Sequence, residues 1–550
     1  MNKPPSATLM RGASMRTRLV SLSLMALFAV LALKGAGMAL VPYERQAGVS
    51  TAFEPPQQRA DIVDRNGLLL ATSVTAYSVF ADPRAIGNAE LIVAELTTVL
   101  PNLDAVKLQK SLANKERAFV WIERGLTPRQ KQTIFDLGLE GVGFRREARR
   151  AYPRGALAGH VLGYAGDDGQ GLGGIEYAQD ARLRNSDAPL RLTLDANVQF
   201  SLEVELAAAI GEYSAEAGAG IVLDAKQGEV LGMASWPPLD PHLATQLGPD
   251  RPALMNRASH AVYELGSVFK PLIVAAALDA GAIRPTDRFD VREPLQIKGR
   301  KIQDDHPITS LATPLEIIAD SSNIGTVKVA WQLGARRQLA FFDSVGLLSR
   351  SSIELAGAAA PLRPTDLDEL TSATTSYGHG IAVSPMSFIS AFAALANQGE
   401  MVQPTLIKTT TKEPLTRRVM AAPTAGLVTQ MMRHAVTDGT GRQADVAGYR
   451  VAGKTGTAEK PIPGGYSEDE NICSFAAIFP ADSPEYVVLI VLDTPKAGAN
   501  RGRAAGWNAA PTAGRVIERI APILGVVPQF DGHDRSPQTR AVSHRGDTTL

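Results

Sequence analysis

Cysteine is almost absent from the sequence, because Cys473 is the only one in 550 residues. A single cysteine excludes an internal disulfide framework and a cysteine-ligated metal cluster. We interpret Cys473 as a small apolar residue within a strand rather than as a catalytic thiol. The H-E-x-x-H pattern of zinc proteases is also missing, so the sequence predicts neither a metal site nor a cofactor.

The chain also lacks an excess of either charge, since 56 basic side chains balance 56 acidic ones. Nucleic-acid-binding domains usually carry a basic excess, so the balance argues against a nucleic-acid partner. Hydrophobic residues make up 45% of the chain, which is long enough for two or three domains with real cores.

A long apolar run, interrupted at Lys34, extends from Leu19 to Val41. As a helix it would measure about 34 Å, enough to cross a bilayer. Residues 1–18 carry basic and no acidic side chains, so the positive-inside rule predicts a cytoplasmic N-terminus and places everything after Val41 outside. The alternative is a signal peptide cleaved near the small residues 35–37. We favour the uncleaved anchor over residues 19–41.

A first domain is expected over residues 42–190, as a mixture of short strands and helices without a catalytic pattern. Its Asn66-Gly67 is a hairpin turn signal between two apolar stretches. Residues 169–174 match G-x-G-x-x-G, but acidic residues 167–168 stand where a strand should be ending. We therefore expect a glycine-rich loop there rather than a dinucleotide site.

A second, α+β domain is expected over residues 191–527, with a helical middle between strand-rich ends. Apolar side chains recur at helical spacing in one segment, and two pairs of apolar segments have the pattern of hairpins. The expected elements are a helix over 197–212, hairpins over 219–235 and 474–492, and a helix over 511–524. Residues 528–550 are polar and aperiodic, which predicts a disordered tail.

Three short motifs follow one another in the second domain: S-x-x-K at 267–270, S-x-N at 321–323 and K-T-G-T at 454–457. Each motif alone is weak evidence. For example, a serine at the start of a helix followed by an exposed lysine would produce the same pattern as Ser267 and Lys270. In combination and in this order they supply the groups of a serine acyltransferase that works without histidine.

The first motif places a candidate base beside a candidate nucleophile. In a helix, Lys270 shares a face with Ser267, and Gly266 allows a sharp entry into that helix. A free lysine has a pKa of about 10.4, too high for a base at neutral pH. Burial and a second cation lower such a pKa, and Lys454 is the candidate for that cation. We therefore predict that neutral Lys270 is the base in acylation.

The other two motifs supply substrate-binding groups. We expect Ser321 to relay a proton to a leaving amine and Asn323 to hold a substrate carbonyl or the base lysine. Alternate residues of a strand face one side, so Thr455 and Thr457 are expected to bind a carboxylate. Gly456 is expected to let substrate approach the backbone closely.

The backbone N–H groups of Ser267 and Thr457 are the predicted oxyanion hole.

Two further clusters of polar residues are weaker candidates than these motifs. We interpret residues 304–306, Asp-Asp-His, as a loop contact rather than a metal or acid/base group. Residues 377–380, Tyr-Gly-His-Gly, either line the cleft or only form a turn.

The chain resembles the class B penicillin-binding proteins, the monofunctional peptidoglycan D,D-transpeptidases, and most of all their cell-division members. The resemblance runs from the anchor to about Gly525. It is carried by the segments 59–71, 150–155, 173–176, 264–271, 321–323, 377–380 and 448–459.

The resemblance implies an elongated N-terminal pedestal, a C-terminal transpeptidase domain with an antiparallel sheet flanked by helices, and one transmembrane helix. It implies an inner-membrane protein with a periplasmic catalytic domain, in which Ser267 is acylated and Lys270 is its base. The implied donor is a stem peptide ending in D-Ala-D-Ala, and β-lactams would trap Ser267. The implied partners are a SEDS-family glycosyltransferase and other division membrane proteins.

The sequence departs from the family pattern at Leu265, Val268, Asp320 and His379 without losing a catalytic group. A serine β-lactamase is one alternative, but it needs a deacylating base and the chain has no matching E-x-x-L-N pattern. The others are an elongation-type transpeptidase and an inactive membrane-anchored division scaffold.

The basic flank before Leu19 leads to a prediction about topology. Alkaline phosphatase fused after Arg45 should be active, because the positive-inside rule places that position outside the cytosol. A cytosolic reporter at the same position should be silent, and the opposite pattern would contradict the predicted orientation.

Overall fold

The computed structural model describes residues 19–34, 58–248, 251–409, 413–496 and 502–530. The chain divides into two units, residues 1–57 and 58–550, which we treat separately. In the first unit, residues 19–34 are helical. Among the described residues, no helix has both the length and the apolar character that crossing a membrane requires. The predicted span lies partly outside the described residues, and the predicted tail lies outside them beyond Phe530.

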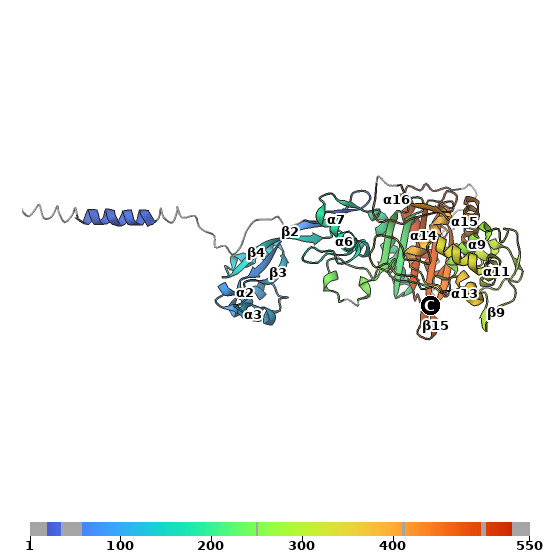
Figure 1. Cartoon of the computed structure of the whole chain (residues 1–550), viewed down its shortest axis with the longest axis horizontal. Coiled ribbons are helices and arrows are strands. Elements are labelled where there is room, and N and C mark those ends of the chain that lie inside the picture. The colour runs from blue at the N-terminus through green and yellow to red at the C-terminus, as the bar shows by residue number, and fades with distance from the viewer. Residues whose placement is uncertain (1–18, 35–57, 249–250, 410–412, 497–501, 531–550) are drawn as a thin grey trace, which may run out of the picture. The chain divides into compact units, whose positions relative to one another are not determined.

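The region before Leu192 combines a small sheet with short helices. Its strands are β1 (Ile62–Val63), β2 (Leu69–Ala81), β3 (Val120–Leu126), β4 (Val142–Ala151) and β5 (Leu190–Arg191). Its helices are α2 (Ala89–Val99), α3 (Ala105–Ala113), α4 (Pro128–Asp136), α5 (Gly159–Leu162), α6 (Gly174–Ala178) and α7 (Asp180–Asn185). Long β2 pairs antiparallel with β1, β3 and β4, and the α2 and α3 helices pack beside them (Figure 1).

The turn signal at Asn66-Gly67 is confirmed. Gly67 has a φ of 91°, in the left-handed region, and joins β1 to its antiparallel partner β2. The Asp64 carboxylate fixes this turn, because it accepts hydrogen bonds of 2.8 Å from the backbone N–H groups of Asn66 and Leu68. An aspartate that caps its own turn is a frequent device at such positions.

The glycine-rich segment is also a loop, as predicted. Strand β4 ends at Ala151 and the next strand begins at Leu190, so the βαβ context of a dinucleotide site is missing. The glycines serve packing instead. A Cβ at Gly171 would lie 1.9 Å from the carbonyl oxygen of Glu176, and one at Gly174 would lie 2.4 Å from the nitrogen of Gly163.

These close contacts surround a buried ion network. Glu176 is fully buried, and one of its carboxylate oxygens lies 2.7 Å from Nη2 of Arg59. Its other oxygen binds Arg150 from the end of β4, while Arg59 also binds Asp180. The network therefore joins the residues before β1, the end of β4 and the α6–α7 segment. Sequence reasoning had not paired these residues.

The second region begins with α8 (Ala196–Tyr213), β6 (Ala217–Asp224) and β7 (Val230–Trp236), and ends with β14 (Ala452–Ile462), β15 (Gly465–Phe479), β16 (Tyr486–Asp493) and α16 (Ala509–Ile523). These elements confirm the two predicted hairpins and both terminal helices. Helix α16 begins two residues before Pro511, where the Asn508 side chain accepts from the first backbone N–H.

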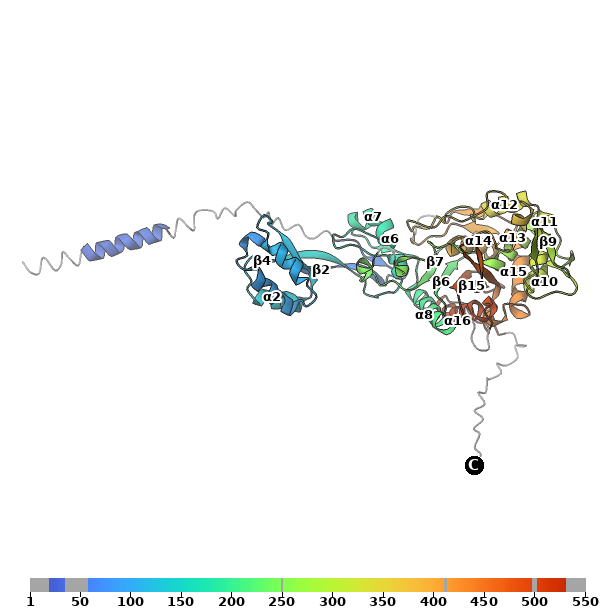
Figure 2. The same cartoon turned by 90° about the horizontal axis from the view of Figure 1, so that it is seen from below.

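The strands form one antiparallel sheet in the order β14-β15-β16-β6-β7. Successive residues of β16 enter different cores: Val487, Leu489 and Val491 contact one core, and Val488 and Ile490 contact the other. A strand that is apolar on both faces must be covered on both sides. Figure 2 shows α8 and α16 together below the sheet and α14 on its other side.

The helical middle of this region covers the face of the sheet opposite α8 and α16, and it carries the first two of the three motifs. Its helices are α9 (Lys270–Asp279), α10 (Pro314–Ala319), α11 (Asn323–Leu333), α12 (Ala335–Ser344), α13 (Glu369–Ser376), α14 (Pro385–Ala396) and α15 (Ala422–Thr437). Short strands accompany them: β8 (Phe289–Asp290), β9 (Leu295–Ile297), β10 (Arg300–Ile302), β11 (Leu311–Ala312), β12 (Glu400–Val402) and β13 (Thr416–Arg418).

The arrangement is the α+β fold with an antiparallel, helix-flanked sheet that was predicted. Cys473 lies fully buried in β15, where its Sγ donates to the carbonyl oxygen of Arg503 at 3.0 Å. Burial raises the pKa of this thiol to about 12, which agrees with an unreactive residue.

Loss of the Glu176 carboxylate should separate the stability of the first region from chemistry at Ser267. Glu176→Ala leaves Arg59 and Arg150 buried without their carboxylate, which should lower the free energy of unfolding by about 3–5 kcal/mol. Protein that remains folded should still react with penicillin, while complementation of division should fail. Denaturant unfolding, penicillin labelling and complementation are the measurements.

The matched control is Arg84→Ala, which breaks an ion pair with Asp82 whose side chains are 59% and 31% exposed. An exposed ion pair contributes little to stability, so this variant should behave as wild type. Equal loss of labelling and division in folded Glu176→Ala would contradict the separation.

Candidate active site

The predicted nucleophile lies on a tight turn rather than within an α-helix. Gly266 has a φ of 65°, and Ser267 follows it in a short 3-10 turn (Gly266–Phe269). The turn continues directly into α9, whose first residue is Lys270. Ser267 and Lys270 were expected to share one face of a helix. They are instead joined by a 3-10 turn that leads into a helix.

Three glycines allow neighbouring segments to approach this turn. A Cβ at Gly266 would lie 2.8 Å from the carbonyl oxygen of Thr457, and one at Gly378 would lie 2.3 Å from that of Gly266. A Cβ at Gly456 would lie 2.2 Å from the carbonyl oxygen of Leu265. The missing side chain of Gly456 makes room for the nucleophile turn, and the close approach of substrate to this backbone stays a prediction.

Lys270 lies fully buried beneath the turn. Its Nζ donates to the backbone carbonyl oxygen of Ser321 and, at 3.1 Å, to the Ser321 hydroxyl. Burial lowers the pKa of Lys270 from 10.5 to about 7, and the charges of Asp304 and Asp305 oppose this shift. Burial disfavours the ammonium form, so a neutral amine is accessible near neutral pH.

Ser321 owes its position to an unusual backbone conformation. It is a non-glycine residue with a φ of 63°, between the end of α10 and the start of α11. Such conformations persist only when the surroundings impose them. Here the buried Asp304 accepts a 2.7 Å hydrogen bond from the Ser322 hydroxyl and a 3.0 Å bond from the N–H of Ile324. Asp304 is therefore a loop contact, as predicted, that fixes the start of α11.

Asn323 and Lys270 have different hydrogen-bond partners. As the first residue of α11, Asn323 donates its side-chain N–H to the carbonyl oxygen of Gln303 at 2.9 Å. Ser321 and Asn323 therefore have different partners.

The third motif lies on β14, the edge strand of the sheet. Lys454 is fully buried, and its Nζ donates to the carbonyl oxygen of Thr455 at 3.1 Å. Burial, followed by the charge of Lys270, lowers the pKa of Lys454 well below its ordinary value. The two lysines do interact, but the pKa of Lys270 is lowered by burial, whereas we had assigned part of that effect to Lys454.

A cleft of about 660 Å³ contains four of the predicted residues: Ser267, Ser321, Thr455 and Thr457. The Thr455 hydroxyl shares a 2.8 Å hydrogen bond with that of Thr440, and the Thr457 hydroxyl accepts one of 3.0 Å from the N–H of Ala505. The expectation that both threonines face one side agrees with their common place in this cleft.

Sequence reasoning missed Arg442 and Trp507, which line the same cleft. Asp305, His306 and Asp320 line it as well, although the sequence had indicated a loop contact for the first two and only a departure from the family pattern for the third. Arg442 and Trp507 lie far from any motif, so only the fold brings them here. Among the described residues, no group of three or more histidine, cysteine or acidic side chains is arranged to hold a metal ion.

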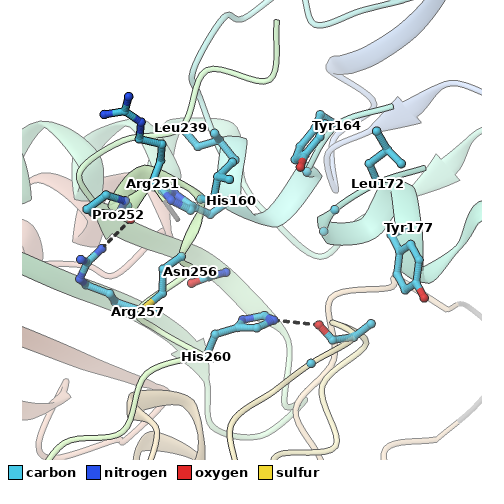
Figure 3. A pocket seen from close by; sticks show the side chains of 17 residues that line it. His160, Tyr164, Leu172, Tyr177, Leu239, Arg251, Pro252, Asn256, Arg257 and His260 are labelled. Atoms are coloured by element: carbon cyan, nitrogen blue, oxygen red, sulfur yellow. Dashed lines mark hydrogen bonds between the residues drawn. The ribbon is translucent and has the colours of Figure 1, made fainter. Parts of the chain in front are cut away.

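Figure 3 shows a second pocket, of about 900 Å³, whose lining does not include Ser267. Its lining includes Tyr164 and Tyr177 from the first region and Arg251 and His260 from the second. His260 is held by a 2.8 Å hydrogen bond between its Nε2 and the carbonyl oxygen of Ala356. None of the three motifs contributes to this pocket, so the acyl-transfer chemistry belongs to the Ser267 cleft.

Comparison with known proteins identifies two family domains in the chain. The penicillin-binding protein transpeptidase domain matches residues 218–518, and the penicillin-binding protein dimerisation domain matches residues 54–207. The first match covers more than half of the chain and includes all three motifs.

Relatives and solved structures agree with these matches. The probable peptidoglycan D,D-transpeptidase FtsI of Caulobacter vibrioides is 42% identical over 85% of this chain and 82% of its own length. The peptidoglycan D,D-transpeptidase FtsI of Escherichia coli K12 is 29% identical over 86% of this chain and 84% of its own length.

A crystal structure of penicillin-binding protein 3 from Mycobacterium tuberculosis in complex with ampicillin matches with a TM-score of 0.70 and 28% identity, covering 87% of this chain and 98% of that one. Fold, family domains and relatives therefore agree. The chain belongs to the class B penicillin-binding proteins of the cell-division type, a family of serine peptidoglycan D,D-transpeptidases.

Proposed function

We propose that this chain cross-links peptidoglycan during septum formation by acyl transfer through Ser267. The observation that carries the proposal is the environment of Lys270, which is buried, bonded to Ser321 and three residues from a serine in an open cleft. Its pKa of about 7 suits a general base at neutral pH.

Acylation begins when neutral Lys270 takes the Ser267 proton and Oγ attacks the carbonyl carbon of the D-Ala-D-Ala peptide bond. The negative oxygen that develops accepts from the backbone N–H groups of Ser267 and Thr457. The bond to the terminal D-Ala then breaks, and its nitrogen receives the proton by way of Ser321. The products are an acyl-Ser267 ester and free D-Ala.

Transfer completes the reaction. The amine of a neighbouring stem peptide attacks the ester carbonyl, its proton returns to Ser267 through the same groups, and a new peptide bond replaces the ester. Thr455 and Thr457 bind the donor carboxylate, with Lys454 beside them, while Gly456 keeps the strand close to the turn. The Asn323 amide, anchored at Gln303, holds a substrate carbonyl.

A β-lactam enters the same reaction at the first step, because its strained amide acylates Ser267 without releasing a leaving group that diffuses away. A serine β-lactamase would release the product quickly, and an inactive scaffold would form none. The likeness to the FtsI transpeptidases favours the septal role over the elongation-type role.

The same proposal includes localisation and partners. Residues 19–41 anchor the chain in the inner membrane with residues 1–18 in the cytosol. Residues 42–190 form the pedestal, and residues 191–527 form the periplasmic transpeptidase domain. The partners are a SEDS-family glycosyltransferase and other division membrane proteins. The balanced charge supports no role for nucleic acid.

Labelling of the full-length protein with a fluorescent penicillin tests the function directly. We expect a stable acyl-enzyme in wild type and none in Ser267→Ala. Rapid loss of the label would indicate a β-lactamase instead, and absence of label in folded wild-type protein would indicate an inactive scaffold.

The two lysines should respond differently to replacement by arginine. Lys270→Arg keeps the charge but cannot become neutral, so the second-order acylation rate should fall by about a hundred- to ten-thousand-fold. Lys454→Arg retains a cation and should keep part of the rate. Lys270→Arg that remains folded and reacts as fast as wild type would exclude Lys270 as the base.

The pH dependence provides a second check on Lys270. Protonated Lys270 cannot accept a proton, so the wild-type acylation rate should rise about tenfold per pH unit below its pKa of about 7 and level off above it. A rate that still rises tenfold per unit between pH 8 and 10 would mean that burial has not lowered this pKa.

A further inference from the structure

A buried carboxylate that the mechanism does not use lies three residues before Ser267. Glu264 is 7% exposed, and its Oε1 accepts a 3.1 Å hydrogen bond from the hydroxyl of Tyr466. Its Oε2 is buried and has no hydrogen-bond partner among the described residues; Nδ1 of His379 lies 3.5 Å away. Neither Glu264 nor His379 lines the Ser267 cleft.

Aromatic rings close this cluster. The rings of His379 and Tyr466 lie 4.4 Å apart at an angle of 34°, and Tyr377 lies 6.2 Å from His379. Burial lowers the pKa of His379, an effect that the Glu264 charge opposes and the Arg300 charge assists. Burial thus favours the neutral imidazole, and ring packing adds to its contact with the carboxylate.

The cluster connects the segments that enclose the nucleophile turn. Glu264 lies two residues before Gly266, whose N–H donates to the carbonyl oxygen of Gly378 at 3.3 Å. His379 directly follows Gly378. Tyr466 belongs to β15, opposite Pro461 of β14, and β14 carries Thr457. One carboxylate thus contacts both segments between which the Ser267 turn is packed.

A buried acid at this position destabilises the fold. A buried polar atom without a partner destabilises a protein, and an apolar side chain of similar size would avoid that penalty. Sites where a chain breaks such a local rule are frequently functional. Stability does not explain why an acid occupies this position. The contacts of Glu264 with the β14–β15 hairpin and the 377–380 turn do provide a reason.

We propose that Glu264 is a positioning residue, whose carboxylate holds the β14–β15 hairpin and the 377–380 turn against the nucleophile turn. It thereby sets the position of Ser267 relative to the backbone N–H of Thr457, with which Ser267 forms the proposed oxyanion hole. Tyr466 is the partner through which Glu264 acts on the hairpin. The inference rests on the proposed role of Ser267 as nucleophile.

The test measures the second-order acylation rate of the full-length protein with one penicillin, together with the thermal unfolding midpoint. Tyr466→Phe removes only the hydroxyl that donates to Glu264 and should lower the rate by about tenfold in protein that is still folded at the assay temperature. Glu264→Ala should lower it at least as much. Glu264→Gln keeps an acceptor oxygen for Tyr466 and should remain within about threefold of wild type.

Coupling separates positioning from a general loss of structure. In the double variant of Glu264→Ala and Tyr466→Phe, the rate should equal that of Glu264→Ala alone, because both changes remove the same contact. Glu459→Ala is the matched control, since this glutamate is exposed on β14, and it should leave the rate unchanged. A Tyr466→Phe rate equal to wild type, additive losses, or a Gln variant as slow as the Ala variant would overturn the proposal.

The outcome also distinguishes this inference from the proposed function. Loss of acylation in Ser267→Ala together with wild-type rates in the Glu264 and Tyr466 variants would reject only the positioning role. Persistent acylation in Ser267→Ala would reject Ser267 as the nucleophile and the positioning role with it.

Discussion

The burial of the Lys270 amine beneath the cleft is the constraint on which the rest of this site depends. Water stabilises an ammonium ion strongly, so a lysine becomes a base near neutral pH only where the protein excludes water from it. Here the exclusion is complete for the side chain, and the Ser321 carbonyl and hydroxyl oxygens satisfy its N–H groups. Because Asp304 and Asp305 pull the pKa upward, burial must outweigh two carboxylates.

Such burial requires segments from distant parts of the chain to meet without gaps. The antiparallel sheet supplies β14 as one wall, and the helical middle supplies α9 and the start of α11 as the others. Side chains would hold these walls apart, and the missing Cβ atoms of Gly266, Gly378 and Gly456 remove that obstacle. The segments that bear the reactive groups therefore also contain the glycines that allow these segments to pack closely.

Elements with a strong local pattern were predictable from the sequence, and contacts between distant residues were not. The α8 helix and the hairpins follow from periodicity and turn residues, which are local properties. The left-handed Ser321, the partner of Asn323 and the side on which Gly456 packs depend on neighbours that only the fold supplies. The Arg59–Glu176 pair spans 117 residues, so no spacing rule could have indicated it.

Glu264 combines a position that is visible in the sequence with contacts that only the fold supplies. Its place three residues before the nucleophile is visible in the sequence, but its two contacts come from β15 and from the turn after α13. A displacement of either segment would alter the geometry of the turn that carries Ser267 and continues directly into α9 at Lys270. The nucleophile and its proposed base share one stretch of backbone, so a shift of this turn would move both. The contacts proposed to place the nucleophile therefore bear on the position of its base as well.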